Sequence, residues 1–119
     1  MTKDILFKAK TLDTNEWVEG YYVMRQDIPY IYTQEEVFRP VDIYTLGEWT
    51  GQSDKNCVKI FENDIIMNLG YRGVVVYGNT GFYSKRLDLD WWRDGDYVYD
   101  TIVGRFAEVI GNVGDECDA

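Results

Sequence analysis

The sequence predicts a mainly β protein made of short strands, with at most one or two short helices. Of its 119 residues, 16% are aromatic and ten are Tyr, and such side chains fit the pleated surface of a sheet better than a helix. Eleven Gly and frequent polar clusters place a turn about every ten residues. Short strands at this spacing are typical of a small barrel or a sandwich.

Each expected strand is an apolar or alternating run bounded by turn residues. The expected strands are residues 5–10, 17–23, 28–32, 41–50, 58–61, 64–68, 73–77, 82–86, 87–92, 97–103 and 108–113. Pro29 confines the third run to a sheet edge or an extended connection. Thr33 and Glu36 have the spacing of a capping box, which allows one short helical turn. Residues 114–119 are expected to form a frayed acidic tail.

The clearest hairpin joins residues 64–68 to 73–77, and Asn63 before it is expected to adopt a positive φ. An acidic turn residue that starts a strand, followed by a Gly on the returning strand, is also typical of the first hairpin of SH3-like barrels. We therefore expect an SH3-like barrel in the C-terminal half. A chain of this length forms one domain by default, residues 1–119, with room for two lobes, 1–50 and 51–113.

The charge disfavours nucleic acid as a partner. The formal net charge is −9, from 12 basic and 21 acidic residues, and the sequence contains no cluster of Lys and Arg. The acidic total fits a need for solubility. An acidic decoy that occupies a nucleic-acid-binding protein, or an SH3-like nucleic-acid binder, remains a less favoured alternative.

Several chemistries are excluded by residue type. The chain contains no His, which removes Ser-His-Asp and Cys-His catalysis and imidazole metal sites. Cys57 and Cys117 lie far apart, so zinc is not expected, and Cys57 lacks a base that would make it a nucleophile. We expect no cofactor. The absence of a leader pattern and of any long apolar run predicts a cytoplasmic protein that does not enter a membrane.

Two sets of acidic residues are candidates for metal chemistry. Asp88, Asp90, Asp94 and Asp96 fail the EF-hand template, because Trp92 falls at a ligand position and Arg93 at the position that requires Gly. Whether residues 88–96 bind a cation by another geometry stays open. Glu62 and Asp64 share a strand face and fit either turn stabilisation or metal-assisted hydrolysis.

The aromatic residues offer the best candidate for an interaction surface. Trp91 and Trp92 are neighbours in an expected strand and therefore point to opposite faces, so at most one can be core if one face is wet. With Trp49 and Tyr97 they form a candidate interaction surface, since Trp is enriched in interfaces. Core packing and the stacking of a small ligand are the alternatives.

Three segments together resemble one known family. They are FKAK at 7–10 with WVEGY at 17–21; TLGEWTG at 45–51 with DKN at 54–56 and IFENDII at 60–66; and EVIGNV at 108–113. In this order and spacing they resemble the YopX family of bacteriophage and prophage proteins over nearly the whole chain. The family pattern has Gly where this chain has Cys57 and Asn63. Asn tolerates the turn conformation, whereas at Cys57 a slightly different turn is expected.

The resemblance implies a largely β protein of phage or prophage origin with no established activity and no catalytic residues to carry over. We therefore expect a non-enzymatic protein-interaction or assembly module. Its partner would be itself, as a homo-oligomer, or a host or phage protein. The alternative is a metal-dependent hydrolase or nucleotide-handling enzyme that uses Asp and Glu ligands.

Overall fold

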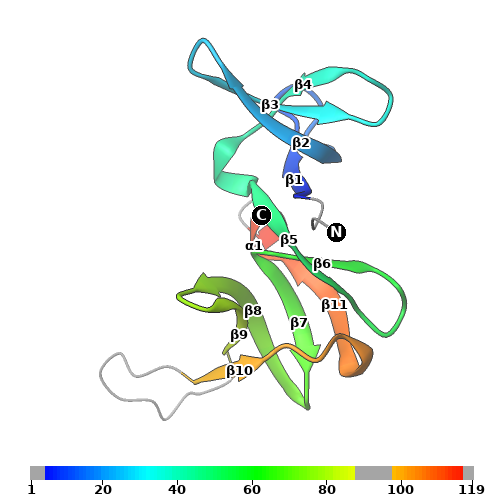
Figure 1. Ribbon diagram of the computed structural model, residues 1–119, viewed down its shortest axis with the longest axis vertical. Coiled ribbons are helices and arrows are strands. Elements are labelled where there is room, and N and C mark those ends of the chain that lie inside the picture. The colour runs from blue at the N-terminus through cyan, green and yellow to red at the C-terminus, as the bar shows by residue number, and fades with distance from the viewer. Residues whose placement is uncertain (1–4, 88–97, 117–119) are drawn as a thin grey trace. The chain divides into compact units, whose positions relative to one another are not determined.

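The computed structural model describes residues 5–87 and 98–116 (Figure 1). It confirms the mainly β prediction, since the strands form two antiparallel sheets. The chain divides into two compact units, Met1–Trp49 and Thr50–Ala119.

The first unit is an antiparallel meander of four strands. They are β1 (Phe7–Lys10), β2 (Trp17–Arg25), β3 (Ile28–Thr33) and β4 (Phe38–Pro40), and each pairs with the next. Beyond β4 the chain returns to the end of β1 through a bridge between Thr11 and Val41. Leu12 N donates to Pro40 O at 3.0 Å, and Pro40 itself has no N–H, so little of the β4 edge is open to further pairing.

One face of this meander forms the core of the first unit. Ala9, Ile31 and Val41 are fully buried there. Phe7, Val18, Tyr22 and Leu46 pack against them. Because successive strand residues point to opposite faces, the alternate residues of β1 to β4 lie on the outward face.

The prediction of a strand at residues 41–50 is wrong for the first half of this segment. Residues Ile43–Thr45 form a 3-10 turn, η1, because the Asp42 carboxylate accepts from Tyr44 N at 3.0 Å and Thr45 Oγ1 donates to Asp42 O at 2.7 Å. These local bonds satisfy backbone groups that a strand ladder would have used. Strand β5 (Gly47–Ser53) follows; Gly47 and Glu48 pair with β1, and β6 (Lys59–Phe61) is its other neighbour.

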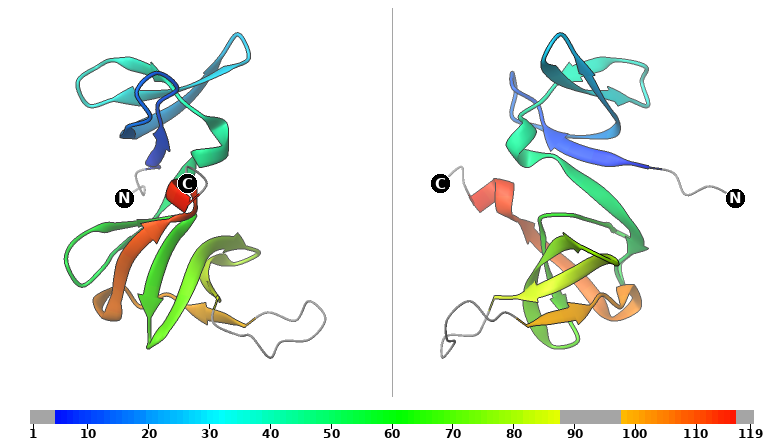
Figure 2. Two further views of the ribbon diagram at one scale, coloured as in Figure 1. Left: turned by 180° about the vertical axis from the view of Figure 1, so that it is seen from behind. Right: turned by 60° about the vertical axis from the view of Figure 1, so that its left-hand side comes forward.

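The second unit contains a five-stranded sheet in the order β10-β9-β8-β7-β11. Its elements are β7 (Asp64–Asn68), β8 (Tyr71–Gly78), β9 (Gly81–Arg86), β10 (Tyr99–Thr101), the 3-10 turn η2 (Gly104–Phe106), β11 (Ala107–Asn112) and the helical turn α1 (Val113–Glu116). The left view of Figure 2 shows β7 between β11 on one side and β8 on the other. In this order the last strand, β11, lies beside the first, β7, and the 3-10 turn η2 precedes it. The strands that the structure describes stay in open sheets and do not close the expected barrel.

The inner face of this sheet carries the second core. Ile60, Ile66, Val75, Ile102 and Ala107 are buried together. Phe82 and Val109 pack against them. The residues of β8, β9 and β10 that alternate with this inner set therefore point outward.

The structure tests the conformations expected at Asn63, at Cys57, at residues 33–36 and in the C-terminal tail. Asn63 has a φ of 74°, which confirms the positive φ, but Cys57 also has a positive φ, 65°, so its turn is not redrawn. No helix forms at residues 33–36, because Thr33 N bonds Val37 O and Glu36 closes the turn at a φ of 63°. The tail is not frayed at residues 114–116, since Asn112 Oδ1 accepts from Gly114 N at 2.7 Å at the start of α1.

Candidate interaction surfaces

The paired acids Glu62 and Asp64 do not present a metal site. Asp64 is fully buried; its Oδ2 accepts from Phe61 N at 2.8 Å and its Oδ1 from Asn112 Nδ2 at 2.8 Å. Both oxygens are therefore used to hold the turn before β7 and the end of β11. Within residues 5–87 and 98–116, no three His, Cys, Asp or Glu side chains gather in a way that could hold a metal ion.

Asp54 plays a similar structural role. Its Oδ1 accepts from Asn56 N and Val58 N, and its Oδ2 from Val109 N, at 2.8 to 2.9 Å. Burial acts to raise the pKa of Asp54, but the N–H groups of Val109, Val58 and Asn56 together outweigh it and hold the pKa below its ordinary value. The ionised carboxylate thus links the turn after β5 to strand β11.

The residues that the sequence predicted as an interaction surface are only partly placed. Trp91, Trp92 and Tyr97, and the four Asp of residues 88–96, lie outside the described residues. Trp49 is described and is half-buried at the end of the first unit. Its backbone N–H donates to Leu6 O at 2.7 Å, so it lies beside the start of β1.

The first surface is a pocket of about 650 Å³ at the turn between β8 and β9, which we call the hairpin pocket. It is lined by Val76, Tyr77, Gly78, Asn79, Thr80, Tyr83, Lys85 and Tyr99. Val76 pairs with Tyr83, and Lys85 with Tyr99, on the outward side of the sheet. These strand positions alternate with the buried Val75 and Ser84.

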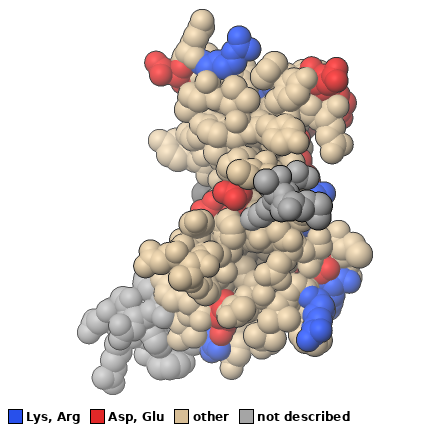
Figure 3. Space-filling view, viewed as in Figure 1, with Lys and Arg blue, Asp and Glu red and all other residues tan. Residues whose placement is uncertain are grey.

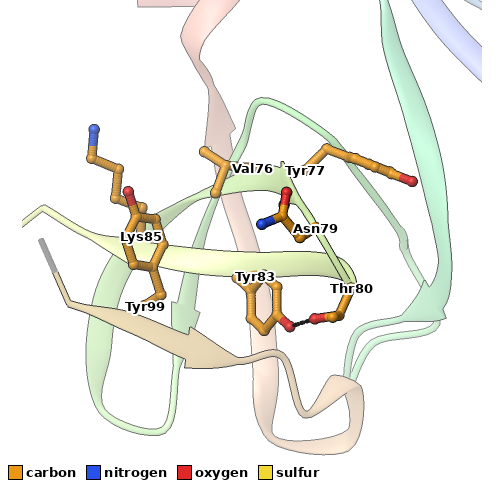
Figure 4. A pocket seen from close by; sticks show the side chains of 8 residues that line it. Val76, Tyr77, Asn79, Thr80, Tyr83, Lys85 and Tyr99 are labelled. Carbon is orange, nitrogen blue, oxygen red and sulfur yellow. Dashed lines mark hydrogen bonds between the residues drawn. The ribbon is translucent and has the colours of Figure 1, made fainter.

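Figure 4 shows how the side chains of the hairpin pocket lie. The hydroxyls of Thr80 and Tyr83 are hydrogen-bonded at one end of the group, and Lys85 and Tyr99 lie near each other at the other end. Tyr77 extends away from the rest, and its ring meets Phe82 edge-on at 5.0 Å. The pocket therefore offers an apolar floor and aromatic walls with polar groups at both ends, which suits an inserted apolar side chain.

The second unit also has exposed apolar residues outside this pocket. Met67, Ile110 and Val113 are exposed on or next to β7 and β11, and Tyr99, which lines the pocket, is 53% exposed. The side of the second unit that is turned to the viewer in Figure 3 is largely uncharged.

The second surface is the outward face of the first unit, which we call the aromatic face. Its residues share one side of β1 to β5 by register: Lys8, Lys10, Trp17, Glu19, Tyr21, Val23, Arg25, Ile28, Tyr30, Tyr32, Phe38, Pro40 and Trp49. Trp49 belongs to it because Gly47, two residues earlier, is paired with Lys8. Six of these side chains are aromatic and three are cationic. Among the described strand residues of this face, Glu19 is the one carboxylate.

Contacts within the aromatic face hold rings and cations together. Tyr21, Tyr32 and Phe38 stand opposite one another on three adjacent strands, and the Tyr32 and Phe38 ring centroids are 4.6 Å apart. Lys8 Nζ and Lys10 Nζ lie 4.9 and 5.6 Å from the centroid of the Trp17 ring. These distances are in the range of cation–π contacts.

Sequence reasoning missed the aromatic face, although one signal for it was present. Tyr30 and Tyr32 alternate with Ile31, so whichever face buries Ile31 leaves both Tyr rings on the other. In β2, Tyr21 and Tyr22 are adjacent, and the sequence does not say which of the two points inward. The register places Tyr22 opposite the buried Ile31 and Tyr21 outside.

The fold and its surfaces define a two-unit antiparallel β protein whose aromatic side chains are concentrated on outward sheet faces. The chain belongs to the YopX protein family, whose family model matches residues 2–117. This confirms the resemblance seen in the sequence. No curated protein matches the chain. In the part of the chain that the structure describes, no helix is long and apolar enough to cross a membrane.

Proposed function

We propose that this YopX-family protein is a non-enzymatic interaction module that binds a protein partner through the hairpin pocket. The observation that carries the proposal is the pocket itself. Val76, Tyr83 and Tyr99 point outward from a sheet whose other face already has a packed core, so the fold does not need them inside. Tyr side chains around a concave apolar site are typical anchors of protein interfaces.

The partner we propose is a protein segment that inserts an apolar or aromatic side chain between Val76 and Tyr99. A second copy of the chain and a host or phage protein both fit this chemistry. Insertion would cover Tyr99, which is 53% exposed, and the polar groups of Thr80 and Lys85 would set the orientation at the rim.

The test compares Val76→Arg with Val37→Arg. Val76 is half-buried and outward-facing, so Arg fills the pocket with a charge and leaves the core unchanged. Val37 is 46% exposed in the first unit and serves as the matched control. Self-association is measured by light scattering after size exclusion, and partners are quantified from host lysate with wild type and both variants as bait.

We expect the wild-type protein to form a complex that contains about equal amounts of the protein and its partner, which is a second copy or one other protein. Val37→Arg should retain this complex, and Val76→Arg should lose it. If Val76→Arg retains every complex that Val37→Arg retains, the hairpin pocket is not the docking site. If all three proteins remain monomeric and return no stoichiometric partner at several salt concentrations, the proposed function is wrong.

A further inference from the structure

The aromatic face of the first unit has a composition that the rest of the acidic chain does not predict. Lys8, Lys10 and Arg25 come from separate places in the sequence, and pairing of β1 with β2 brings them to the same side of one sheet. Glu19 is directly opposite Lys8 in the register. Among the described strand residues of this face, three cations therefore stand against one carboxylate, although the chain as a whole carries −9.

The rings of this face are arranged across strands. Adjacent strands are about 4.8 Å apart, so Tyr21, Tyr32 and Phe38 form a row of three rings perpendicular to the chain direction. Tyr21 is 58% and Phe38 is 43% exposed. A sheet face with two or three ring side chains in reach of one another is the arrangement on which unpaired bases stack.

The cations stand where a backbone that crosses this row would pass. Arg25 Cζ lies 5.4 Å from the centroid of the Phe38 ring, and Arg25, Gln26, Tyr30 and Phe38 line a small pocket of about 250 Å³ at the β2–β3 turn. Lys8 and Lys10 lie at Trp17, on the other side of Tyr21 along β2. Positive charge thus flanks the ring row at both ends.

From this arrangement we propose that the aromatic face binds single-stranded nucleic acid, with bases stacked on Tyr21, Tyr32 and Phe38 and phosphates near Arg25 and Lys8. Lys10 is buried, so it adds to the local positive charge without contacting a phosphate. Stacking needs no base sequence, since every base has a π face, so little sequence preference is expected. The site is distinct from the hairpin pocket and does not depend on the function proposed for it.

The small number of cations on this face predicts how strongly the affinity depends on salt concentration. Two phosphate contacts, at Arg25 and Lys8, predict a slope of about −1.4 for the logarithm of the association constant against the logarithm of salt concentration. A tenfold rise in NaCl should therefore weaken binding by about 25-fold and no more. Each exposed ring that is removed should weaken binding by roughly tenfold.

The experiment measures fluorescence anisotropy of labelled 12-nucleotide oligothymidine and oligouridine with the full chain, from low to moderate NaCl. Tyr21→Ala and Arg25→Gln are compared with wild type, and Tyr44→Ala is the matched control, because Tyr44 is 91% exposed and lies in η1, outside the strands that form the aromatic face. Tyr21→Phe keeps the ring and should bind as wild type does. Thermal melts confirm that each variant is folded.

We expect both probes, or one of them, to bind with the predicted slope, and Tyr21→Ala and Arg25→Gln to lose affinity while Tyr44→Ala, Tyr21→Phe and Val76→Arg do not. The relative affinity of the two probes tells which sugar is preferred. The proposal is overturned if neither probe binds at about 100 µM protein in low salt. It is also overturned if a polyglutamate peptide displaces the oligonucleotide, if a duplex binds equally well, or if Tyr44→Ala weakens binding as much as Tyr21→Ala.

Discussion

Asp54 Oδ2 accepts a hydrogen bond from the backbone N–H of Val109 at 2.9 Å, across 55 positions of sequence. The same carboxylate holds Asn56 N and Val58 N through Oδ1. Asp54 is 6% exposed, so water cannot easily replace it as an acceptor. One side chain therefore ties the turn after β5 to the last strand of the second unit.

Replacement of Asp54 should strongly destabilise the protein. Asp54→Ala leaves three backbone donors without their partner, and we expect a loss of about 3 kcal/mol in the free energy of unfolding. Urea denaturation followed by Trp fluorescence measures it. Asp13→Ala is the control, because Asp13 is exposed in the first unit and its loss should leave the midpoint nearly unchanged. Equal midpoints for the two variants would contradict the bracing role.

Asp54 should also contribute to the acid sensitivity of the fold. Its pKa is lower in the folded chain than in the unfolded chain, so its contribution is fully present above the unfolded value of about 3.9 and is lost as pH falls through the folded value. Asp54→Asn cannot titrate. Its urea midpoint, although lower at pH 7, should therefore fall less than that of wild type between pH 5 and acid values. A parallel fall in both proteins would show that other carboxylates set the pH dependence.

Asp64 and Asn112 should be energetically coupled. They are joined at 2.8 Å and both are buried, so removal of either side chain leaves the other without this bond. A double-mutant cycle of Asp64→Ala and Asn112→Ala should give a coupling energy of about 1 to 2 kcal/mol. Additive losses would mean that the bond contributes little and that each residue acts through separate contacts.

The turn between β2 and β3 should accept a stabilising change. Gln26 and Asp27 have φ values of 52° and 66°, the pair of positive angles found in a two-residue hairpin turn. Asn-Gly adopts this conformation more readily, so Gln26→Asn with Asp27→Gly should raise stability by about 1 kcal/mol. Leu69→Asn, at a φ of 53° before Gly70, is an independent case of the same effect. A lower melting temperature in both variants would refute this reading of the turns.

Cys57 should be a strained position. It is an exposed free thiol at a φ of 65°, where a side chain other than Asn or Asp is unfavourable. Cys57→Gly should therefore raise the melting temperature, with a gain of about 0.5 to 1 kcal/mol, whereas Cys57→Ala should not. Calorimetry under reducing conditions compares the three proteins. A gain of the same size from Ala would point to the thiol and not to the backbone.

Local patterns predicted the parts of the fold that local physics controls. The hairpin of β7 and β8, the last strand and the turn at Asn63 follow from alternation and turn chemistry within a few residues. Residues 43–45 escaped prediction because their apolar side chains suit a strand, while Asp42 and Thr45 satisfy backbone groups in a tighter turn. That competition depends on hydrogen bonds that composition does not reveal.

The candidate surfaces were predicted less well than the fold. Trp49 was named from the sequence and does lie on the aromatic face by register, but Tyr21, Tyr32 and Phe38 were not singled out. β2 has aromatic or apolar residues on both of its faces, so its pattern does not state which is buried. Packing in the core around Ile31 decides which face of β2 is buried. This core is formed by the pairing of strands that are far apart in the sequence.

The sequence by itself determined the mainly β class, the family, the acidic charge and the lack of His, because these depend on composition, on short motifs and on residue order. Only the tertiary structure decided that Lys8, Lys10 and Arg25 share a face with a row of rings, and that Asp54 and Asp64 brace the second unit. The physical reason is that side-chain direction and hydrogen-bond partners are fixed by register and packing between distant segments. The sequence of a single strand specifies neither the direction of its side chains nor their hydrogen-bond partners.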